Sequence, residues 1–316
     1  MITLFFWMGL SVVIYKGLHS GFNPHFSEPN QLKNLTGEFK TVTYNVAGLP
    51  EFISQSKPSV NMPIIGKKLS QYALALVQED FWYSHELQEH ADFTYKNNPV
   101  VKSSVGDGLG QFSQIPLVSE DHEAWQDCHG IIGDQNDCLT PKRFSFSKME
   151  FAPGVLGHVY NLHLDAGESA EDEIVRSRQL RQLATYIKTR SEGYPLIVAG
   201  DFNFHLEKKD SADLLPYLEF LKETGLTDAC YATHCSEERL DRILYRSNPK
   251  VFLTAKSWNV ENDFKDKSGE SLSDHEPVAV NFTYQINLSP EEMQASLVSY
   301  EREKFSESLQ EISHNQ

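Results

Sequence analysis

Short apolar runs rich in β-branched residues recur through the middle of the 316-residue chain, and they constrain its fold more than any other feature. Runs of this length and residue type favour β-strands. They cover residues 39–46, 74–78, 100–104, 144–151, 155–163, 195–199, 240–245 and 277–284. Apolar residues at helical spacing lie between some of them, at 66–73, 171–190 and 213–224. This alternation is too irregular for a βαβ repeat, so it predicts an α/β fold with two sheets and helices outside them.

Polar side chains stand at the ends of five of these strands. Strand ends are where sheets place ligands, because a side chain there escapes the core while its backbone stays fixed. Carboxylate oxygens are ligands that Mg²⁺ prefers, and a carboxylate with an imidazole can prepare a water nucleophile. Amide and imidazole groups can hydrogen-bond a phosphate without repelling it. Together these groups predict a site for metal-assisted phosphoester hydrolysis, formed by Asn45, Glu79, His163, Asp201, Asn203, Asp274 and His275.

Six short motifs, in order along residues 41–282, resemble those of the endonuclease/exonuclease/phosphatase superfamily, the fold of pancreatic deoxyribonuclease and neutral sphingomyelinase. The resemblance implies a four-layer α/β/β/α sandwich, in which two mixed β-sheets pack face to face and helices cover both outer faces. The motifs are Thr-Tyr-Asn-Val (43–46), Val-Gln-Glu (77–79), Asn-Leu-His-Leu (161–164), Gly-Asp-Phe-Asn (200–203), Leu-Asp-Arg-Ile (240–243) and Ser-Asp-His-Glu-Pro-Val (273–278).

A bound divalent cation is also implied by the resemblance: Mg²⁺, or in its place Mn²⁺ or another divalent ion. By the same resemblance, Glu79 is the main metal ligand and Asn45 lies beside it. Asp274 is implied to be a further ligand or a carboxylate next to the ligands.

The resemblance assigns the proton-transfer and phosphate-binding roles to other residues. His275 is implied to be the general base or its equivalent, oriented by Asp241, and Asp201 to position the attacking water. Asn203 and His163 are implied to bind the scissile phosphate, and His163 could also protonate the leaving group. A carboxylate beside an imidazole fixes its tautomer and raises its basicity, which gives the His–Asp pair a physical reason.

Three segments resemble the sphingomyelinase-like branch of this superfamily: residues 137–144, 161–167 and 254–258, although Arg143 stands where Gly is usual. The charge sum of 28 basic and 44 acidic residues, −16, disfavours a long polyanion but not a zwitterionic head group. The sequence therefore favours a Mg²⁺-dependent phosphodiesterase that acts on a phospholipid head group, a sphingomyelinase-like phospholipase C. An extracellular Mg²⁺-dependent endonuclease and a non-catalytic member that binds phosphate ligands or partners are the alternatives.

Transient contact with a membrane surface is expected of such an enzyme. Bacterial sphingomyelinases often carry an aromatic, membrane-touching hairpin before the last motif, but residues 259–272 here are charged and nearly free of aromatic residues. Residues 50–66 offer apolar side chains instead, and these form either a lipid-facing lip or the inner side of a packed loop. They are Phe52, Ile53, Met62, Ile64 and Ile65.

The two ends of the chain differ from its middle. Residues 2–15 contain no charged residue and fit the apolar region of a signal peptide or an uncleaved anchor, without a basic flank or a clear cleavage site. We expect this segment over residues 1–20, a linker over 21–38, the catalytic domain over 39–285 and a C-terminal amphipathic helix or tail over 286–316. Ser289, Pro290 and Glu292 form the predicted start of that last helix, with a capping box.

Four cysteines stand in two close pairs, Cys128 with Cys138 and Cys230 with Cys235. The spacing favours two local disulfides, which persist only outside the cytosol. Free thiols and zinc binding with neighbouring histidines are the alternatives. The cysteines and the N-terminal segment together predict a secreted or extracytoplasmic protein. If that segment is not cleaved, we expect it to anchor the protein to a membrane.

Overall fold

The computed structural model describes residues 35–54, 56–96, 106–130, 138, 142–152, 154–208, 210–235, 239–299 and 302. The predicted N-terminal signal or anchor segment, most of the linker, the strand at 100–104 and residues 303–316 of the tail lie outside these ranges. No helix among the described residues is long and apolar enough to cross a membrane. The first strand begins at Leu35, so the last residues of the predicted linker belong to the folded domain.

Two six-stranded mixed sheets form the centre of the molecule. Sheet A has the strand order β11-β12-β1-β2-β4-β3, and sheet B has the order β5-β6-β7-β8-β10-β9. The sheet A strands are β1 (Leu35–Asn45), β2 (Leu74–Gln78), β3 (Tyr95–Lys96), β4 (Gly110–Ser113), β11 (Val251–Val260) and β12 (Val278–Ile286). The sheet B strands are β5 (Leu117–Ala124), β6 (Arg143–Ala152), β7 (Val155–His163), β8 (Leu196–Asp201), β9 (Thr227–Asp228) and β10 (Asp241–Arg246).

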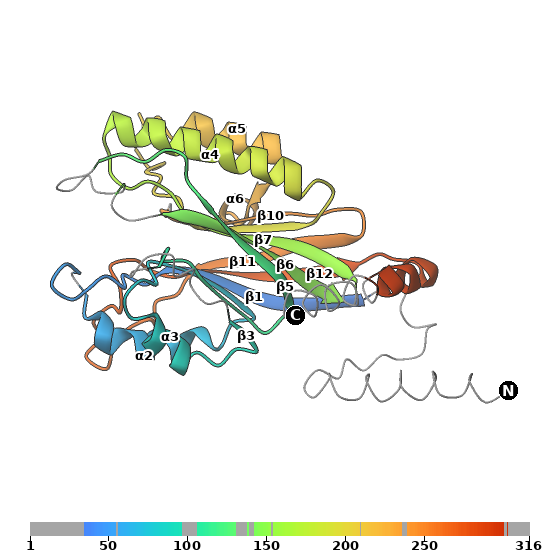
Figure 1. Ribbon diagram of the computed structural model, residues 1–316, viewed down its shortest axis with the longest axis horizontal. Coiled ribbons are helices and arrows are strands. Elements are labelled where there is room, and N and C mark those ends of the chain that lie inside the picture. The colour runs from blue at the N-terminus through green and yellow to red at the C-terminus, as the bar shows by residue number, and fades with distance from the viewer. Residues whose placement is uncertain are drawn as a thin grey trace, which may run out of the picture.

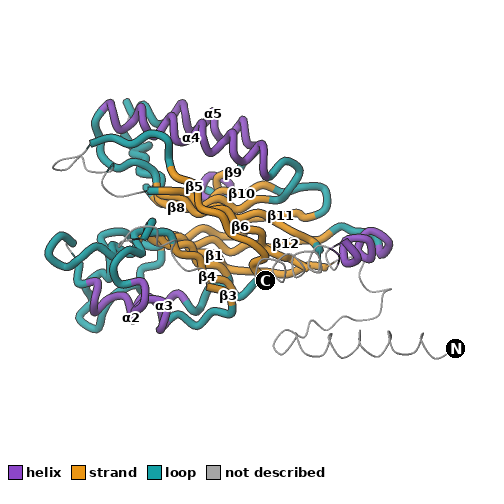
Figure 2. The backbone as a smooth tube through the Cα atoms, viewed as in Figure 1, coloured by secondary structure: helices purple, strands orange, loops and turns teal. Residues whose placement is uncertain are grey.

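Helices cover the outer face of each sheet (Figures 1 and 2). Helices α2 (Pro58–Leu69) and α3 (Ser84–His90) lie on sheet A, and α4 (Ala170–Arg190) and α5 (Leu214–Thr224) lie on sheet B. The short α6 (Ala229–Ala232) precedes β10. The predicted four-layer α/β/β/α sandwich is therefore confirmed.

Alternation along the strands divides the core into three layers. In β1, Phe39 faces sheet B, whereas Val42 and Tyr44 face the helices on sheet A. Because successive side chains of a strand point to opposite faces, one strand supplies both layers. The central layer joins residues of both sheets, among them Phe39, Leu74, Leu76, Val159, Ile197, Ile243 and Phe282, all less than a tenth exposed.

A buried polar contact joins the two sheets within this core. Gln78 Nε2 donates to Asn161 Oδ1 at 2.7 Å, from β2 to β7. Asn161 Nδ2 donates in turn to the carbonyl oxygens of Val77, at 2.9 Å, and Gly110, at 3.0 Å. Both side-chain amides are fully buried, so these bonds fix how sheet B lies over sheet A.

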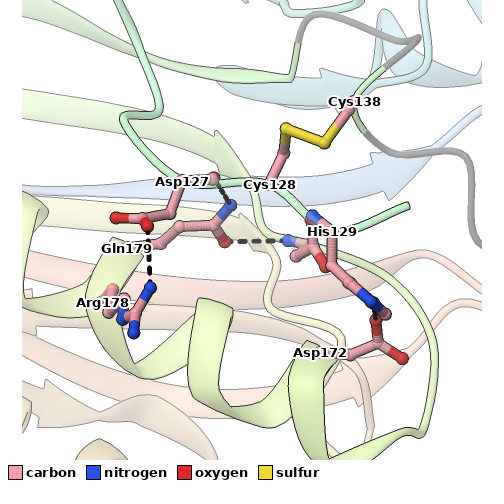
Figure 3. The surroundings of a disulfide bond; sticks show 8 residues. Asp127, Cys128, His129, Cys138, Asp172, Arg178 and Gln179 are labelled. Atoms are coloured by element: carbon pink, nitrogen blue, oxygen red, sulfur yellow. Dashed lines mark hydrogen bonds and ion pairs between the residues drawn. A yellow bond between two sulfur atoms is a disulfide. The ribbon is translucent and has the colours of Figure 1, made fainter. Parts of the chain in front are cut away.

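Helix α4 begins as its sequence predicts. Ser169 caps it, and a capping box forms between Ser169 and Asp172. His129 Nδ1 lies 2.6 Å from the carboxylate of Asp172, so this helix start also holds the segment that carries the first disulfide (Figure 3). Helix α5 ends at Gly225, whose φ of 68° is the left-handed conformation that glycine adopts without strain.

Helix α2 departs from the sequence prediction. A helix was expected from residue 66, but it begins at Pro58 and contains Pro63. Met62 and Ile65 are fully buried against sheet A, so of the two alternatives for residues 50–66 the packed one holds for these two side chains and the lipid-facing lip does not. Phe52 remains exposed in the turn before the helix.

The predicted start of the C-terminal helix is confirmed. Residues 290–299 are helical, and the main-chain N–H of Glu292 donates to Ser289 Oγ while the Glu292 carboxylate accepts from the Ser289 N–H. Met293 is buried in the central core layer. The described part of this helix therefore packs against the sandwich.

Both predicted disulfides are present. Cys128 and Cys138 are joined with their Cα atoms 5.2 Å apart, and Cys230 and Cys235 with theirs 4.9 Å apart. The described chain has no free cysteine, so the zinc and free-thiol alternatives are excluded for these four residues.

Candidate active site

Strand register brings the predicted residues to one end of both sheets. In sheet B, His163 at the end of β7 pairs with Asp201 at the end of β8, and Asp201 pairs with Asp241 at the start of β10. In sheet A, Asn45 at the end of β1 pairs with Gln78, and Glu79 follows directly. Neighbouring strands lie about 4.8 Å apart, so three functional side chains form a row on sheet B.

Asn45 joins the two halves of the site. Its Nδ2 donates to Glu79 Oε1 at 2.9 Å and to Asp201 Oδ2 at 3.1 Å. Its Oδ1 accepts from the N–H of Ala47 at 3.1 Å, which fixes the orientation of the amide. One buried side chain thus bridges a carboxylate of sheet A and a carboxylate of sheet B.

The backbone reverses sharply at these strand ends. Ala47, Glu79 and Asn203 have positive φ angles of 49°, 57° and 53°. Such conformations cost about 1–3 kcal/mol for residues other than glycine and concentrate at functional sites. Glu79 is a site residue itself, and Ala47 and Asn203 follow the site residues Asn45 and Asp201 by two positions.

His275 and Asp241 form the predicted pair. His275 Nδ1 lies 2.7 Å from Asp241 Oδ2, and His275 Nε2 lies 3.6 Å from Asp201 Oδ2. His163 Nε2 approaches the same Asp201 oxygen at 3.4 Å from the other side. Asp201 therefore lies between two imidazoles. Asp241 contacts the Nδ1 atom of His275, on the side of that ring away from Asp201.

Burial and charge move the pKa values of these groups in opposite directions. Burial would lower the pKa of His275, but Asp241 and Asp201 raise it well above its ordinary value. Burial would raise the pKa of Asp201, but His275 and His163 reverse this and hold it below its ordinary value. Burial, with help from Lys142, lowers the pKa of His163 to about 3. Near pH 7 the site thus holds a charged His275, an ionised Asp201 and a neutral His163.

Asn203 and Asp274 lie at the edge of this cluster. The Asn203 N–H donates to Asp201 Oδ1 at 3.0 Å, and its side-chain amide donates to the Leu164 carbonyl at 3.0 Å. Asp274 is exposed, and its charge raises the pKa values of both Glu79 and His275. The structure thus assembles all eight predicted residues at one end of the sandwich.

Lys142 is a charged member of this cluster that the sequence analysis did not single out. Its charge lowers the pKa values of Glu79, Asp201 and His163, and its Nζ donates to the Leu164 carbonyl at 3.1 Å. It lies in the 137–144 motif, but only its place directly before β6 could have suggested a role. Lys142 brings a positive charge to a site otherwise dominated by carboxylates.

The first disulfide lies close to the same loops (Figure 3). Gln179 on α4 donates to the Asp127 carbonyl at 3.0 Å and accepts from the Asp165 N–H at 2.9 Å. Asp127 precedes Cys128, and Asp165 follows His163 by two residues. One glutamine therefore fixes the disulfide-bearing segment against the turn that carries His163.

A charged cluster of His122, Asp107 and Glu120, called the His122 clasp, supports the sheet A turn next to Glu79. The Asp80 N–H, next to Glu79, donates to the Gly108 carbonyl at 2.9 Å. Asp107, beside that glycine, lies 2.5 Å from His122 Nδ1, and Glu120 lies 2.7 Å from His122 Nε2. The His122 side chain is 4% exposed. It holds a sheet A turn against strand β5 of sheet B.

Residues 42–275 match the sequence model of the Endonuclease/Exonuclease/phosphatase family. The chain belongs to this family. Its expected branch is supported by sphingomyelinases of Mycobacterium tuberculosis and Mycobacterium bovis, each 34% identical over 279 residues, which make up 79% of this chain and 54% of the relative. The chain thus spans about half the length of these curated relatives.

Three further proteins are similar. Human sphingomyelin phosphodiesterase 2 is 24% identical over 307 residues, covering 83% of this chain and 68% of that protein. Sphingomyelinase C from Streptomyces griseocarneus superposes with a TM-score of 0.58 at 18% identity, over 78% of this chain and 99% of that one. A mutant beta toxin from Staphylococcus aureus with bound magnesium ions superposes with a TM-score of 0.58 at 16% identity, over 77% and 99%. At this identity the two structures establish the shared fold of this family member.

The donor set of this family member fits a divalent cation. Glu79, Asp201 and Asp241 converge, and an oxygen of Asp241 is buried without a hydrogen-bond partner among the described residues. Burial raises the pKa of Glu79, and the charges of Asp274 and Asp201 raise it further. Oxygen atoms crowded in this way are the ligands that Mg²⁺ prefers, and a cation would offset their repulsion. Within the described chain, Asp201, Asp241 and His275 also place three ligand atoms within 4.8 Å of one another.

Proposed function

We propose that this chain is a metal-dependent phosphodiesterase that cleaves the head group from a phospholipid, in the manner of a sphingomyelinase or phospholipase C. The observation that carries the proposal is the junction in which Asn45 bonds to both Glu79 and Asp201, beside the His275–Asp241 pair. The 34% identity to mycobacterial sphingomyelinases over 279 residues supports this substrate class. The net charge of −16 also favours a zwitterionic head group over a nucleic acid.

Glu79, with Asp274 beside it, would hold the cation, and Asn45 would join them only through its Oδ1, which accepts from the Ala47 N–H. A bound divalent ion supplies charge stabilisation to the phosphoryl oxygens and can lower the pKa of a coordinated water. These residues come from the ends of β1 and β2 and the connection before β12, which the sandwich holds at fixed spacing.

The attacking water, positioned by Asp201, gives up its proton to His275 in the fraction of the protein in which this imidazole is neutral. The titrations of His275 and Asp201 are linked, because the two groups lie 3.6 Å apart and each shifts the other. Asp241 fixes the imidazole and stabilises it when charged. As the water oxygen bonds to phosphorus, the bond to the lipid alcohol oxygen breaks. That oxygen takes a proton from solvent water to become a neutral alcohol, and the base returns the proton it accepted to the solvent.

His163 acts as a hydrogen-bond donor to the phosphoryl group in this scheme. Its pKa of about 3 leaves it neutral near pH 7, so it carries one N–H and no charge. Its main chain is held in place, because the Trp125 indole donates to its carbonyl oxygen at 2.7 Å. Lys142 and Asn203 are the other groups that can offset charge on the phosphate. These roles favour phosphate binding by His163 over proton donation to the leaving group.

We also propose that the protein works outside the cytosol. The support is its two disulfides, because such bonds persist in oxidising compartments and are rare in the cytosol. Anchoring by the apolar residues 2–15 remains part of this proposal.

Phosphocholine release from sphingomyelin vesicles tests the proposed function. The full-length protein is assayed with Mg²⁺, with Mn²⁺ and with chelator, and plasmid nicking is measured in parallel. Release of phosphocholine that stops with chelator and in Glu79→Gln is the expected result. Nicking without phosphocholine release would replace the lipid substrate with a nucleic acid, and no turnover of either substrate would indicate a non-catalytic member.

A further inference from the structure

Three large apolar side chains are exposed at the same end of the sandwich as the site. Phe52 is 88% exposed, Ile53 58% and Trp82 55%, and together they are called the apolar rim. They lie in the connections that follow β1 and β2. These two strands are parallel neighbours, with Asn45 opposite Gln78, so both connections leave sheet A at one edge.

The apolar rim is bonded to the backbone of the proposed metal ligands. The Gly48 N–H donates to the Glu79 carbonyl at 2.9 Å, and the Trp82 N–H donates to the Gly48 carbonyl at 3.0 Å. Ser54 Oγ donates to the Ala47 carbonyl at 3.3 Å. These bonds fix the position of the rim relative to the Glu79 carboxylate.

The turn that carries Phe52 satisfies two of its own backbone donors. The N–H groups of Ile53 and Ser54 both donate to the Pro50 carbonyl, at 2.8 and 2.9 Å. An unsatisfied backbone N–H costs several kcal/mol in hydrocarbon, and these bonds avoid that cost. The turn can therefore enter an apolar phase with the side chains of Phe52 and Ile53 pointing into it.

The connection before β12 offers no comparable surface among the described residues. Its one aromatic side chain, Phe264, is 3% exposed and packs edge-on against Tyr44, with ring centroids 5.1 Å apart. Its exposed side chains include Asp263 and Lys265, which are charged. Of the described connections of sheet A at this end, those after β1 and β2 therefore carry the large exposed apolar side chains.

We propose that the apolar rim inserts into the interfacial region of a zwitterionic phospholipid bilayer and presents a lipid phosphate to the site. This inference rests on the proposed function, because the acyl chains of a phospholipid substrate stay in the bilayer while its phosphate reaches Glu79 and Asp201. Tryptophan and phenylalanine suit this interfacial depth. The net charge of −16 opposes docking to an anionic membrane, which is why the bilayer is zwitterionic.

Assays on two substrates, one in vesicles and one monomeric, distinguish an effect on membrane docking from an effect on phosphodiester hydrolysis. Full-length wild type and a Phe52→Ser/Ile53→Ser double variant are assayed on phosphatidylcholine vesicles that contain sphingomyelin, and on a short-chain sphingomyelin analogue kept monomeric. The vesicle rate should fall at least about tenfold, while the rate on the monomeric analogue stays within about twofold. An unchanged vesicle rate in the double variant would overturn the proposal and leave the proposed function intact.

Phe252→Ser is the matched control. Phe252 is 46% exposed at the start of β11, where the paired residues Val251, Ile286 and Leu35 mark the opposite end of sheet A from Asn45. The same loss of an exposed aromatic side chain should leave both rates unchanged. A vesicle defect as large as that of the double variant would show that general surface apolarity, and not the rim, carries the effect.

A second readout does not depend on turnover. Vesicles with brominated acyl chains quench tryptophan emission on contact, and the quenching is compared between wild type and Trp82→Phe in chelator. We expect a quenched component in wild type that is absent from Trp82→Phe. Equal quenching in both proteins would overturn the proposal even if neither substrate were hydrolysed, in which case the proposed function fails separately.

Discussion

Raising the pH from 5.5 to 10 should remove the stabilisation that the His122 clasp gives to the fold. Burial would lower the pKa of His122, but its hydrogen bonds to Asp107 and Glu120 raise it from 6.5 to about 9. The stabilisation is therefore complete below pH 6.5 and is lost as the pH rises through 9. A shift of 2.5 units, at about 1.36 kcal/mol per unit, corresponds to about 3 kcal/mol of unfolding free energy.

Urea unfolding of wild type and His122→Gln at pH 5.5 and pH 10 measures this contribution. Glutamine keeps a polar side chain but does not titrate. Wild type should lose about 3 kcal/mol more than the variant between the two pH values. Other titrating groups are common to both proteins, so their effects cancel in the comparison. Parallel losses in wild type and variant would show that Asp107 and Glu120 do not hold a charged imidazole, and would refute the reasoning.

Glu79→Gln should lower kcat/KM by about two orders of magnitude or more and abolish the rise in Tm caused by Mg²⁺, with an unchanged circular dichroism spectrum; full activity in chelator would contradict this. Asp241→Asn should lower the pKa of His275, because Asp241 helps to raise it, and so move the acidic limb of the kcat/KM profile to lower pH. That substitution should also add little to the loss caused by His275→Ala, and an unmoved limb with additive losses would refute the pairing. Replacing Cys128 and Cys138 by Ser should lower the free energy of unfolding in urea by about 2–3 kcal/mol, and an unchanged midpoint would contradict it.

Strands with regular alternation and buried helices with caps could be predicted from the sequence. The strands at 74–78 and 155–163 match β2 and β7, and the helix expected over 171–190 matches α4 to within one residue. Strand β5 was missed because it is an edge strand of mixed charge, Leu-Val-Ser-Glu-Asp-His-Glu-Ala, without a period-two pattern. The first turns of α2 were missed because Pro63 removes an N–H from the helix interior.

The residue types of the site could also be predicted, because carboxylate, amide and imidazole side chains gather at strand ends. Which carboxylate lies beside which imidazole could not be predicted from any local pattern in the sequence. That Asp201 lies between two imidazoles follows from the register of β7, β8 and β10, which no local pattern encodes. The opposite pKa shifts of His163 and His275 follow from burial and from the carboxylates around each ring. His122 shows the same limit, since its partner Asp107 lies in a turn that leads into the other sheet.

The buried amide contact between Gln78 and Asn161 has a consequence for how loss of function can arise. It holds the sheet that carries Glu79 in register with the sheet that carries His163 and Asp201. If the sheets slipped by a fraction of a strand spacing, every helix, strand and disulfide would persist while the two halves of the site parted. Damage of this kind would leave a circular dichroism spectrum nearly unchanged, because the secondary structure persists. The chain can therefore be inactivated from its interior, at residues that touch no substrate, without being unfolded.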